Sequence, residues 1–269
     1  MSLGGTTAKE VGNISFLRSF VIANNTFHRF IPDEMYIPMS LPIAARSSRL
    51  DKGNFENNYP SGNLPVDIYE KLSKLERLGI LSNQISGNIP PSLGTCANLK
   101  LLSLTRNKFN GSIPMELGNL SRLQILQHRF NNLIGDLPSS IFNISSLLTI
   151  SIRQNKISGN FPEDPCKRPS NLERLELSEN MFHGEVSLSL LNCRALKLLN
   201  ISNNGFIGSI PEEIGILSSL RWLDMSYNGF SGSIPKGIGN VSALRHIDLS
   251  YNNLTGTIPY SIGNMSNIE

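Results

Sequence analysis

Apolar residues recur along the chain in a pattern with a step of 24 residues. In the segment that begins at Leu99, apolar residues fill positions 1, 4 and 6, and Asn, Gly and Pro fill positions 9, 13 and 16. The same order begins again at Leu17, Leu50, Leu75, Leu123, Leu147, Leu172, Leu196, Leu220 and Leu244. The step is 33 residues after Leu17 and 25 after Leu50 and Leu147. Ten copies of LxxLxLxxNxLxGxIPxxLGxL predict a solenoid of stacked coils.

Each part of the repeat predicts one part of a coil. The LxxLxL segment is too short to bury itself, so as a strand it pairs with neighbouring coils about 4.8 Å away. Its apolar side chains enter the interior and the intervening ones face outward. The IPxxLG segment predicts turns and short 3-10 helices on the convex side. We therefore expect an α/β, right-handed repeat solenoid with a parallel concave sheet.

Position 9 is asparagine in every repeat. A side-chain amide offers two N–H donors and an acceptor, so it satisfies backbone groups where a strand becomes a loop. Stacked asparagines predict a ladder of hydrogen bonds, formed by Asn25, Asn58, Asn83, Asn107, Asn131, Asn155, Asn180, Asn204, Asn228 and Asn252.

Positions 13 and 16 carry backbone-specific residues. Glycine fills position 13 in nine repeats, with Arg29 the exception, and indicates a turn of positive φ or a close backbone approach. Proline at position 16 fixes φ where strand pairing ends, and Ser187 replaces it once.

The repeats divide the chain simply. Residues 17–268 hold the ten repeats and residues 1–16 part of an earlier one, with an insertion near 33–49. That insertion is either a lateral loop or a product of altered splicing. Because the chain begins and stops within a repeat and shows no cap, we expect either an internal segment of a longer protein or a truncated gene product.

The xGxIPxxLGxL part of the repeat resembles the plant-specific leucine-rich repeat family. It appears at 111–120, 208–217, 232–241 and 256–265 as GSIPMELGNL, GSIPEEIGIL, GSIPKGIGNV and GTIPYSIGNM, and the resemblance extends from Val11 to Ile268. The resemblance implies an extracellular or secreted receptor-like protein or receptor-like kinase. Such a protein binds a peptide, a protein ligand or a co-receptor ectodomain in defence or developmental signalling at the membrane. The alternatives are a secreted polygalacturonase-inhibitor-like protein and an intracellular repeat scaffold.

Composition adds little and gives no case for catalysis. The net charge of +3 does not indicate nucleic-acid binding, and no apolar run is long enough to span a bilayer. The first residues lack the features of a secretory signal. No phosphate loop, HExxH or CxxC motif occurs, so we expect no enzyme, metal or cofactor. The trio Asp224, His246 and Ser250 on neighbouring strands is better explained by the repeat pattern.

One candidate ligand site is a group of arginines at outward positions of successive repeats, which we call the basic strip. Arginine suits carboxylate and sulfate groups. The alternative is a solvated surface, partly paired to Glu173, Glu176 and Glu179. The candidate residues are Arg106, Arg129, Phe130, Arg153, Gln154 and Arg174, with Arg77 further out.

A second candidate, for a partner, is an aromatic group at positions 3 and 8 of the last two complete repeats. It comprises Trp222, Tyr227, His246 and Tyr251, with Arg221 and Arg245 nearby. Aromatic residues beside arginines are typical of protein contacts. The alternative is that tyrosine in LSYN is a common variant of the repeat.

His128 and the cysteines depart from the pattern. His128 occupies position 6, where an apolar residue is expected, and an irregular strand explains it better than a buried ring. Cys96 and Cys193 take position 22 as small apolar residues. Cys166 lies one coil before Cys193, close enough for a bridge, but we expect free thiols.

Nine N-x-S/T sequons are consistent with a secreted glycoprotein, although the repeat itself generates five of them. They begin at Asn13, Asn24, Asn110, Asn119, Asn143, Asn200, Asn240, Asn253 and Asn264.

Overall fold

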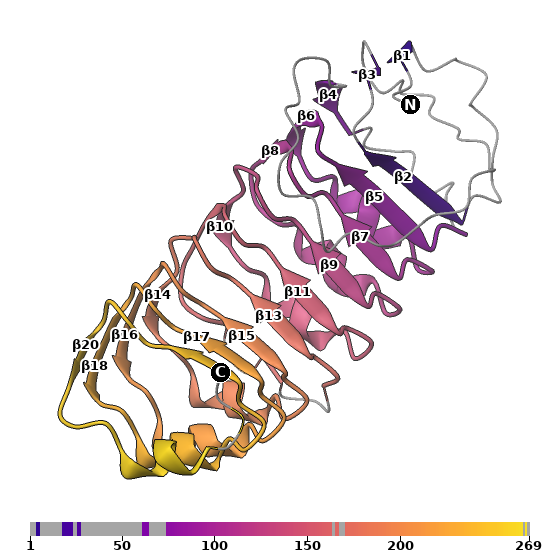
Figure 1. Cartoon of the computed structure of the whole chain (residues 1–269). Coiled ribbons are helices and arrows are strands. Elements are labelled where there is room, and N and C mark those ends of the chain that lie inside the picture. The colour runs from indigo at the N-terminus through magenta and orange to yellow at the C-terminus, as the bar shows by residue number, and fades with distance from the viewer. Residues whose placement is uncertain are drawn as a thin grey trace.

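The computed structural model describes residues 4–5, 18–23, 26–27, 61–64, 74–162, 165–166, 170–265 and 267. The predicted insertion at 33–49 lies outside these residues, as do Arg29, Asn25 and Asn58. The described coils stack along one axis, as Figure 1 shows.

The main sheet has nine strands, all paired in parallel. Equivalent positions of successive repeats lie opposite each other, so that Leu102 pairs with Leu126 and Leu126 with Ile150. Along the sheet the strands are β2 (Ser19–Ala23), β5 (Arg77–Leu81), β7 (Leu101–Ser103), β9 (Ile125–Gln127), β11 (Thr149–Ser151), β13 (Arg174–Glu176), β15 (Leu198–Asn200), β17 (Trp222–Asp224) and β19 (His246–Asp248).

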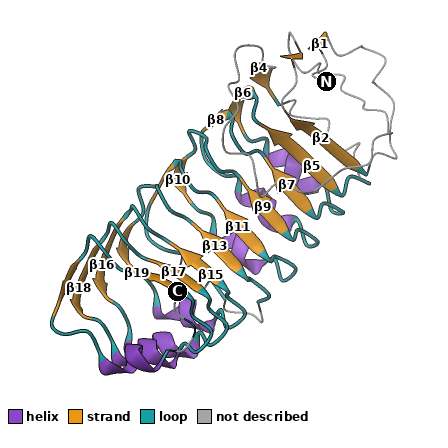
Figure 2. Cartoon of the chain, viewed as in Figure 1, coloured by secondary structure: helices purple, strands orange, loops and turns teal. Residues whose placement is uncertain are grey.

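Shorter strands form lateral sheets along one edge of the stack, and 3-10 helices gather along another (Figure 2). These parallel strands and short helices confirm the predicted solenoid. The lateral strands are β4 (Ser61–Asn63), β6 (Gln84–Asn88), β8 (Lys108–Asn110), β10 (Ile134–Asp136), β12 (Lys156–Ser158), β14 (His183–Glu185), β16 (Gly205–Ser209), β18 (Gly229–Ser233) and β20 (Asn253–Thr255), and β1 (Gly4–Gly5) pairs with β3 (Thr26–Phe27).

Glycine at position 13 allows the lateral strands to approach one another. Its φ is positive in all nine repeats that carry it, between +69° and +124°. A Cβ atom on Gly111 would lie 2.4 Å from the Oδ1 atom of Asn88 in the preceding coil. The positive φ therefore favours glycine there, and the absence of a Cβ atom leaves room for the Asn88 side chain.

Proline at position 16 precedes most of the 3-10 helices and holds the chain extended before them. Its φ lies between −61° and −70° at these helix starts. Ser187, the exception, has φ −58° and ψ 135°, and its Oγ accepts a hydrogen bond from the Ser189 N–H at 3.2 Å. Capping by serine therefore replaces the stiffness of proline. The helices are η3 (Pro91–Thr95), η4 (Met115–Asn119), η5 (Ser139–Asn143), η6 (Leu188–Asn192), η7 (Glu212–Ile216), η8 (Lys236–Asn240) and η9 (Tyr260–Asn264).

The interior is a continuous column of aliphatic and phenylalanine side chains. Positions 1, 4 and 6 supply buried leucines and isoleucines, and position 11 supplies Phe109, Phe182, Phe206 and Phe230. The Phe206 ring lies 5.9 Å from Phe182 and 6.4 Å from Phe230, so the aromatic contacts pass from coil to coil. Each of the helices in the described part of the chain is five residues long, too short to cross a bilayer.

Asparagine at position 9 joins each coil to the one before it. The Asn131 Oδ1 atom accepts a hydrogen bond from the Phe109 N–H at 3.1 Å. Its Nδ2 atom donates to Leu104 O of the preceding coil at 2.9 Å, and to His128 O and Arg129 O of its own coil. The same set of bonds recurs at Asn107, Asn155, Asn180, Asn204, Asn228 and Asn252.

We expect Asn131→Ala to destabilise the fold strongly, because it removes every partner of a bridging amide at once. Leaving these backbone groups without partners costs roughly 2–4 kcal/mol in the free energy of unfolding. The matched control Asn132→Ala removes an exposed amide from the adjacent position and should cost about 0.5 kcal/mol or less. Urea unfolding measures both variants, and equal losses would contradict the bridging role of Asn131.

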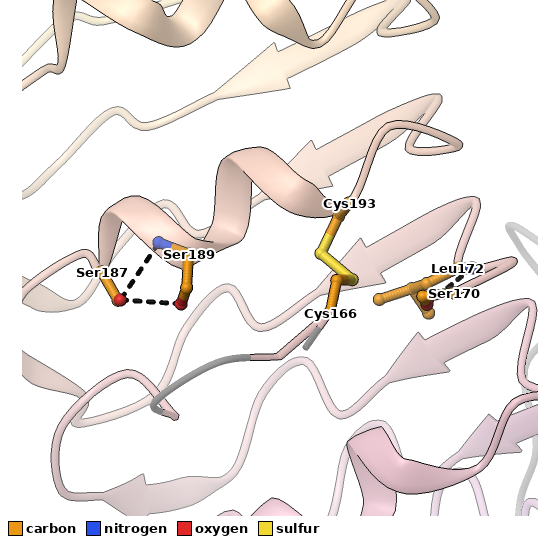
Figure 3. Close-up of a disulfide and its surroundings, with 6 residues drawn as sticks. All are labelled: Cys166, Ser170, Leu172, Ser187, Ser189 and Cys193. Atoms are coloured by element: carbon orange, nitrogen blue, oxygen red, sulfur yellow. Dashed lines mark hydrogen bonds between the residues drawn. A yellow bond between two sulfur atoms is a disulfide. The ribbon is translucent and has the colours of Figure 1, made fainter. Parts of the chain in front are cut away.

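The expectation of free thiols at Cys166 and Cys193 is wrong. These cysteines form a disulfide with a Cα–Cα distance of 5.2 Å, which joins the irregular turn before Leu172 to the end of η6 (Figure 3). That separation lies within the range that a disulfide spans without backbone movement. The sequence placed Cys166 one coil away but did not show how the turn directs its side chain.

Non-reducing peptide mapping should recover a peptide that joins Cys166 to Cys193. The bridge closes a loop with a sequence separation of 27, so the Cys166→Ser, Cys193→Ser variant should lose about 3 kcal/mol of stability. Recovery of the two cysteines in separate peptides would contradict the pairing.

The expectation of an irregular strand at His128 is also wrong. The His128 N–H donates to Ser151 O at 2.8 Å, and its side chain is fully buried at position 6. The Nδ1 atom lies 2.8 Å from Gln127 O, and the Nε2 atom has no hydrogen-bond partner. Burial, partly offset by the Gln127 carbonyl, lowers the pKa of His128 from its usual 6.5 to about 4.

We predict an acid-labile fold that His128→Leu makes less sensitive to pH. Because the folded pKa is below the unfolded one, the wild type loses stability as the pH falls from about 6.5 to 4. The shift corresponds to about 3 kcal/mol. Thermal unfolding at pH 7.5 and pH 4 measures the loss of stability in the wild type and in His128→Leu, and the variant should lose less. The control His183→Leu, at an exposed site on β14, should keep the wild-type dependence. An identical pH dependence in His128→Leu would refute the assignment.

Candidate functional site

Position 8, directly before each bridging asparagine, adopts a left-handed backbone conformation. Its φ lies between +52° and +59° in all eight described repeats from Ser82 to Tyr251, although none of these residues is glycine. The Phe130 N–H donates to Arg153 O, and the Phe130 carbonyl accepts from the Asn107 N–H. Bonds between coils thus hold a conformation that costs roughly 1–2 kcal/mol per residue. Sequence reasoning missed this feature, because none of the ten residues at position 8 is glycine and only three are asparagine.

The structure brings the first part of the basic strip together around Phe130. The Arg106 guanidinium lies 5.0 Å from the centre of the Phe130 ring, and the Arg153 guanidinium lies 5.7 Å from it. The three residues come from three successive coils. An aromatic face between two cations stabilises both by cation–π attraction.

Three arginines of the strip are paired with carboxylates. Arg129 and Arg174 both approach Glu176, at 3.7 and 3.0 Å, and Arg153 binds Glu179 at 2.7 Å. Glu173 pairs instead with Lys197, outside the strip, at 2.7 Å. Pairing with Glu176 and Glu179 belongs to the alternative interpretation of the sequence, a solvated surface without a ligand.

Glu176 is the anionic centre of this network. Burial alone would raise the pKa of Glu176, but the Ser151 hydroxyl at 2.6 Å and the guanidinium groups of Arg129 and Arg174 hold that pKa below its usual value. Within the described residues no carboxylate pairs with Arg106, so Arg106 is the member of the strip best placed to receive an anion. Gln154 occupies position 8 of the coil that follows the coil of Phe130.

The structure also brings the four candidate aromatic residues together, as two stacked pairs that we call the aromatic cluster. Trp222 lies opposite His246 in the sheet, with 3.7 Å between their ring centres. The rings of Tyr227 and Tyr251 are 4.0 Å apart. The exposed fractions of Trp222, Tyr227 and Tyr251 are 41%, 51% and 69%.

Aspartates at position 5 of these repeats hold the serines at position 7. The Asp224 Oδ1 atom accepts hydrogen bonds from the N–H and hydroxyl of Ser226, and Asp248 does the same for Ser250. Asn200 makes the equivalent bonds to Ser202, at 3.1 and 2.7 Å. The Ser250 hydroxyl is thus directed to Asp248 and the His246 ring to Trp222, so Asp224, His246 and Ser250 do not form a catalytic triad. The described residues also contain no group of side chains able to hold a metal ion.

Most of the described sequons lie away from the concave sheet. Asn119, Asn143 and Asn240 are exposed at the ends of η4, η5 and η8. Asn110 and Asn253 are exposed on the lateral strands. Asn200, on β15, is the exception, since it lies on the main sheet between Glu176 and Asp224.

Comparisons with known proteins identify the repeat. The family described as Leucine Rich Repeat matches residues 98–120, 195–217, 219–241 and 243–265. No curated protein sequence matches the chain. These four segments are leucine-rich repeats, and the fold of the chain is similar to that of a plant receptor kinase ectodomain.

Solved structures match the chain over nearly its whole length. The complex of PEPR1 with AtPEP1 has a TM-score of 0.83 and 34% identity over 100% of this chain. The Arabidopsis receptor kinase HAESA, with the peptide hormone IDA and the co-receptor SERK1, has a TM-score of 0.80 and 31% identity over 96%. The plant peptide hormone receptor RGFR1, in complex with RGF2, has a TM-score of 0.67 and 26% identity over 99%. The chain spans only 36%, 41% and 49% of the lengths of these three proteins.

Proposed function

We propose that this chain is a peptide-binding segment of an extracellular plant receptor ectodomain, either a receptor-like protein or a receptor-like kinase. The parent protein would act at the outer face of the plasma membrane, in defence or developmental signalling, and carry glycans on its convex and lateral faces. The structures of HAESA and RGFR1 support this proposal, because HAESA is a receptor kinase in complex with a peptide hormone and a co-receptor, and RGFR1 is a peptide hormone receptor in complex with RGF2. A co-receptor ectodomain is the second partner class that we propose.

The observation that carries the proposal is the contact of Phe130 with Arg106 and Arg153. The aromatic ring contacts both guanidinium groups without neutralising either. Arg153 is paired with Glu179, whereas Arg106 has no carboxylate partner among the described residues. A planar guanidinium recognises a carboxylate through two parallel hydrogen bonds. An acidic side chain or the C-terminal carboxylate of a peptide is therefore the group that we expect here.

Arg106→Ala should weaken peptide binding at least about tenfold, which corresponds to about 1.4 kcal/mol. The probe is a synthetic peptide of about ten residues with a free C-terminal carboxylate, selected for binding to this chain from a displayed random library. Calorimetric titration compares it with the same peptide made as a C-terminal amide. Arg106 is a cleaner target than Arg129, because Arg129→Glu would place a second carboxylate beside Glu176.

The matched control is Lys108→Ala, which removes the same charge from the lateral strand β8, where Lys108 contacts Gln84. It should leave peptide affinity unchanged. Failure of the library to yield any peptide that depends on Arg106 would contradict the proposal. An equal loss in both variants would show that only general charge matters, and would also count against it.

A further inference from the structure

Two acidic residues occupy strand positions between those of the residues that form the stacked pairs. Asp224 and Asp248 occupy position 5 of β17 and β19, whereas Trp222 and His246 occupy position 3, and Tyr227 and Tyr251 position 8. The two aspartates lie opposite each other on adjacent strands, so their backbones are about 4.8 Å apart.

Each aspartate uses only one of its two oxygen atoms within the protein. The Oδ1 atoms hold Ser226 and Ser250, and the Oδ2 atoms accept no hydrogen bond from any residue in the described part of the chain. Two like charges on adjacent strands repel each other. Asn200 fulfils the same structural role without a charge, so holding the serine does not require a carboxylate.

Asp248 and the aromatic cluster share one electrostatic environment. Hydrogen bonds from Ser250, outweighing the effect of burial and assisted by His246, hold the pKa of Asp248 below its usual value. The pKa of Tyr227 is raised by its hydrogen bond with Tyr251 and in smaller part by the charge of Asp248. The Asp248 carboxylate therefore interacts electrostatically with one member of each stacked pair.

We propose that Asp224 and Asp248, with the aromatic cluster, form a binding site for an arginine side chain of a peptide or protein ligand. A planar guanidinium suits this arrangement, because it stacks on aromatic rings and offers several N–H donors to adjacent carboxylates. The exposed parts of Trp222 and Tyr251 supply the aromatic contact, and the Oδ2 atoms supply the acceptors.

The site gives direction to the binding surface, and this part of the inference rests on the proposed function. The basic strip around Phe130 would take an acidic group, whereas the cluster four coils further along takes a basic one. Four strand spacings amount to about 19 Å, which an extended peptide spans in about six residues. A ligand with an acidic and a basic group at that separation would contact both sites.

Trp222 reports on this site directly, because it is the single tryptophan of the chain. The probe is N-acetyl-arginine amide, titrated at constant ionic strength while Trp222 fluorescence is recorded. The matched probe is N-acetyl-citrulline amide, which has nearly the same shape but no charge. We expect a saturable change with the arginine probe and at least tenfold weaker binding of the citrulline probe. Equal responses to the two probes, or no saturable response to arginine, would overturn the proposal.

The variant Asp224→Asn, Asp248→Asn removes both charges and keeps the bonds to the serines, as Asn200 shows. It should bind the arginine probe at least tenfold more weakly than the wild type. The control Asp136→Asn makes the same chemical change on the lateral strand β10 and should bind like the wild type. Undiminished binding by the double variant would overturn the proposal.

The result is separable from the test of the proposed function. Arg106→Ala should leave the arginine titration unchanged, since Arg106 lies in a different part of the sheet. If arginine binds normally but the peptide selection fails, the proposed peptide-receptor function is refuted and the arginine site is retained. If only the arginine response is absent, the arginine site is refuted and the proposed role of the basic strip is retained.

Discussion

The structure depends on one interaction, the side-chain amide that bridges consecutive coils at position 9. A single coil cannot satisfy its own backbone groups where the strand turns into the loop, because the chain there is neither helical nor paired within itself. The Asn131 amide accepts a hydrogen bond from the Phe109 N–H and donates to Leu104 O and His128 O, and it thereby supplies the missing partners across two coils. A column of such bonds makes each coil depend on its neighbour, which is the physical basis of a solenoid.

The same bridge positions the residues that face a ligand. Position 8 lies directly before the asparagine, and the bonds between coils keep it in a left-handed conformation. Side chains as different as Arg106, Phe130 and Tyr251 are therefore presented from the same backbone geometry. A uniform scaffold leaves chemical identity to the variable positions, so a single substitution there changes recognition without a change of fold.

The concave face is chemically uneven along its length. Around Phe130 the cations predominate, but Glu176 and Glu179 neutralise much of their charge. Towards the last coils, stacked aromatic rings surround Asp224 and Asp248. Such a face would favour one orientation of an extended, charged ligand over the reverse, because reversal would place like charges together.

The sequence by itself determined the repeat, the ladder, the glycine turns and the proline-led helix starts. These features depend on periodicity and on the backbone preferences of single residues, which can be seen without any knowledge of neighbours. It also selected the concave residues of the basic strip and the aromatic cluster.

Only the tertiary structure decided which side chains meet between coils. The burial of His128, the bridge between Cys166 and Cys193 and the pairing of Arg129 with Glu176 each join residues from different turns of the chain, or depend on how those turns pack. The left-handed conformation of position 8 likewise arises from bonds to the adjacent coil rather than from its own residue type. A repeat pattern fixes which positions are adjacent, but side-chain length, direction and local turn geometry decide which of them bind each other.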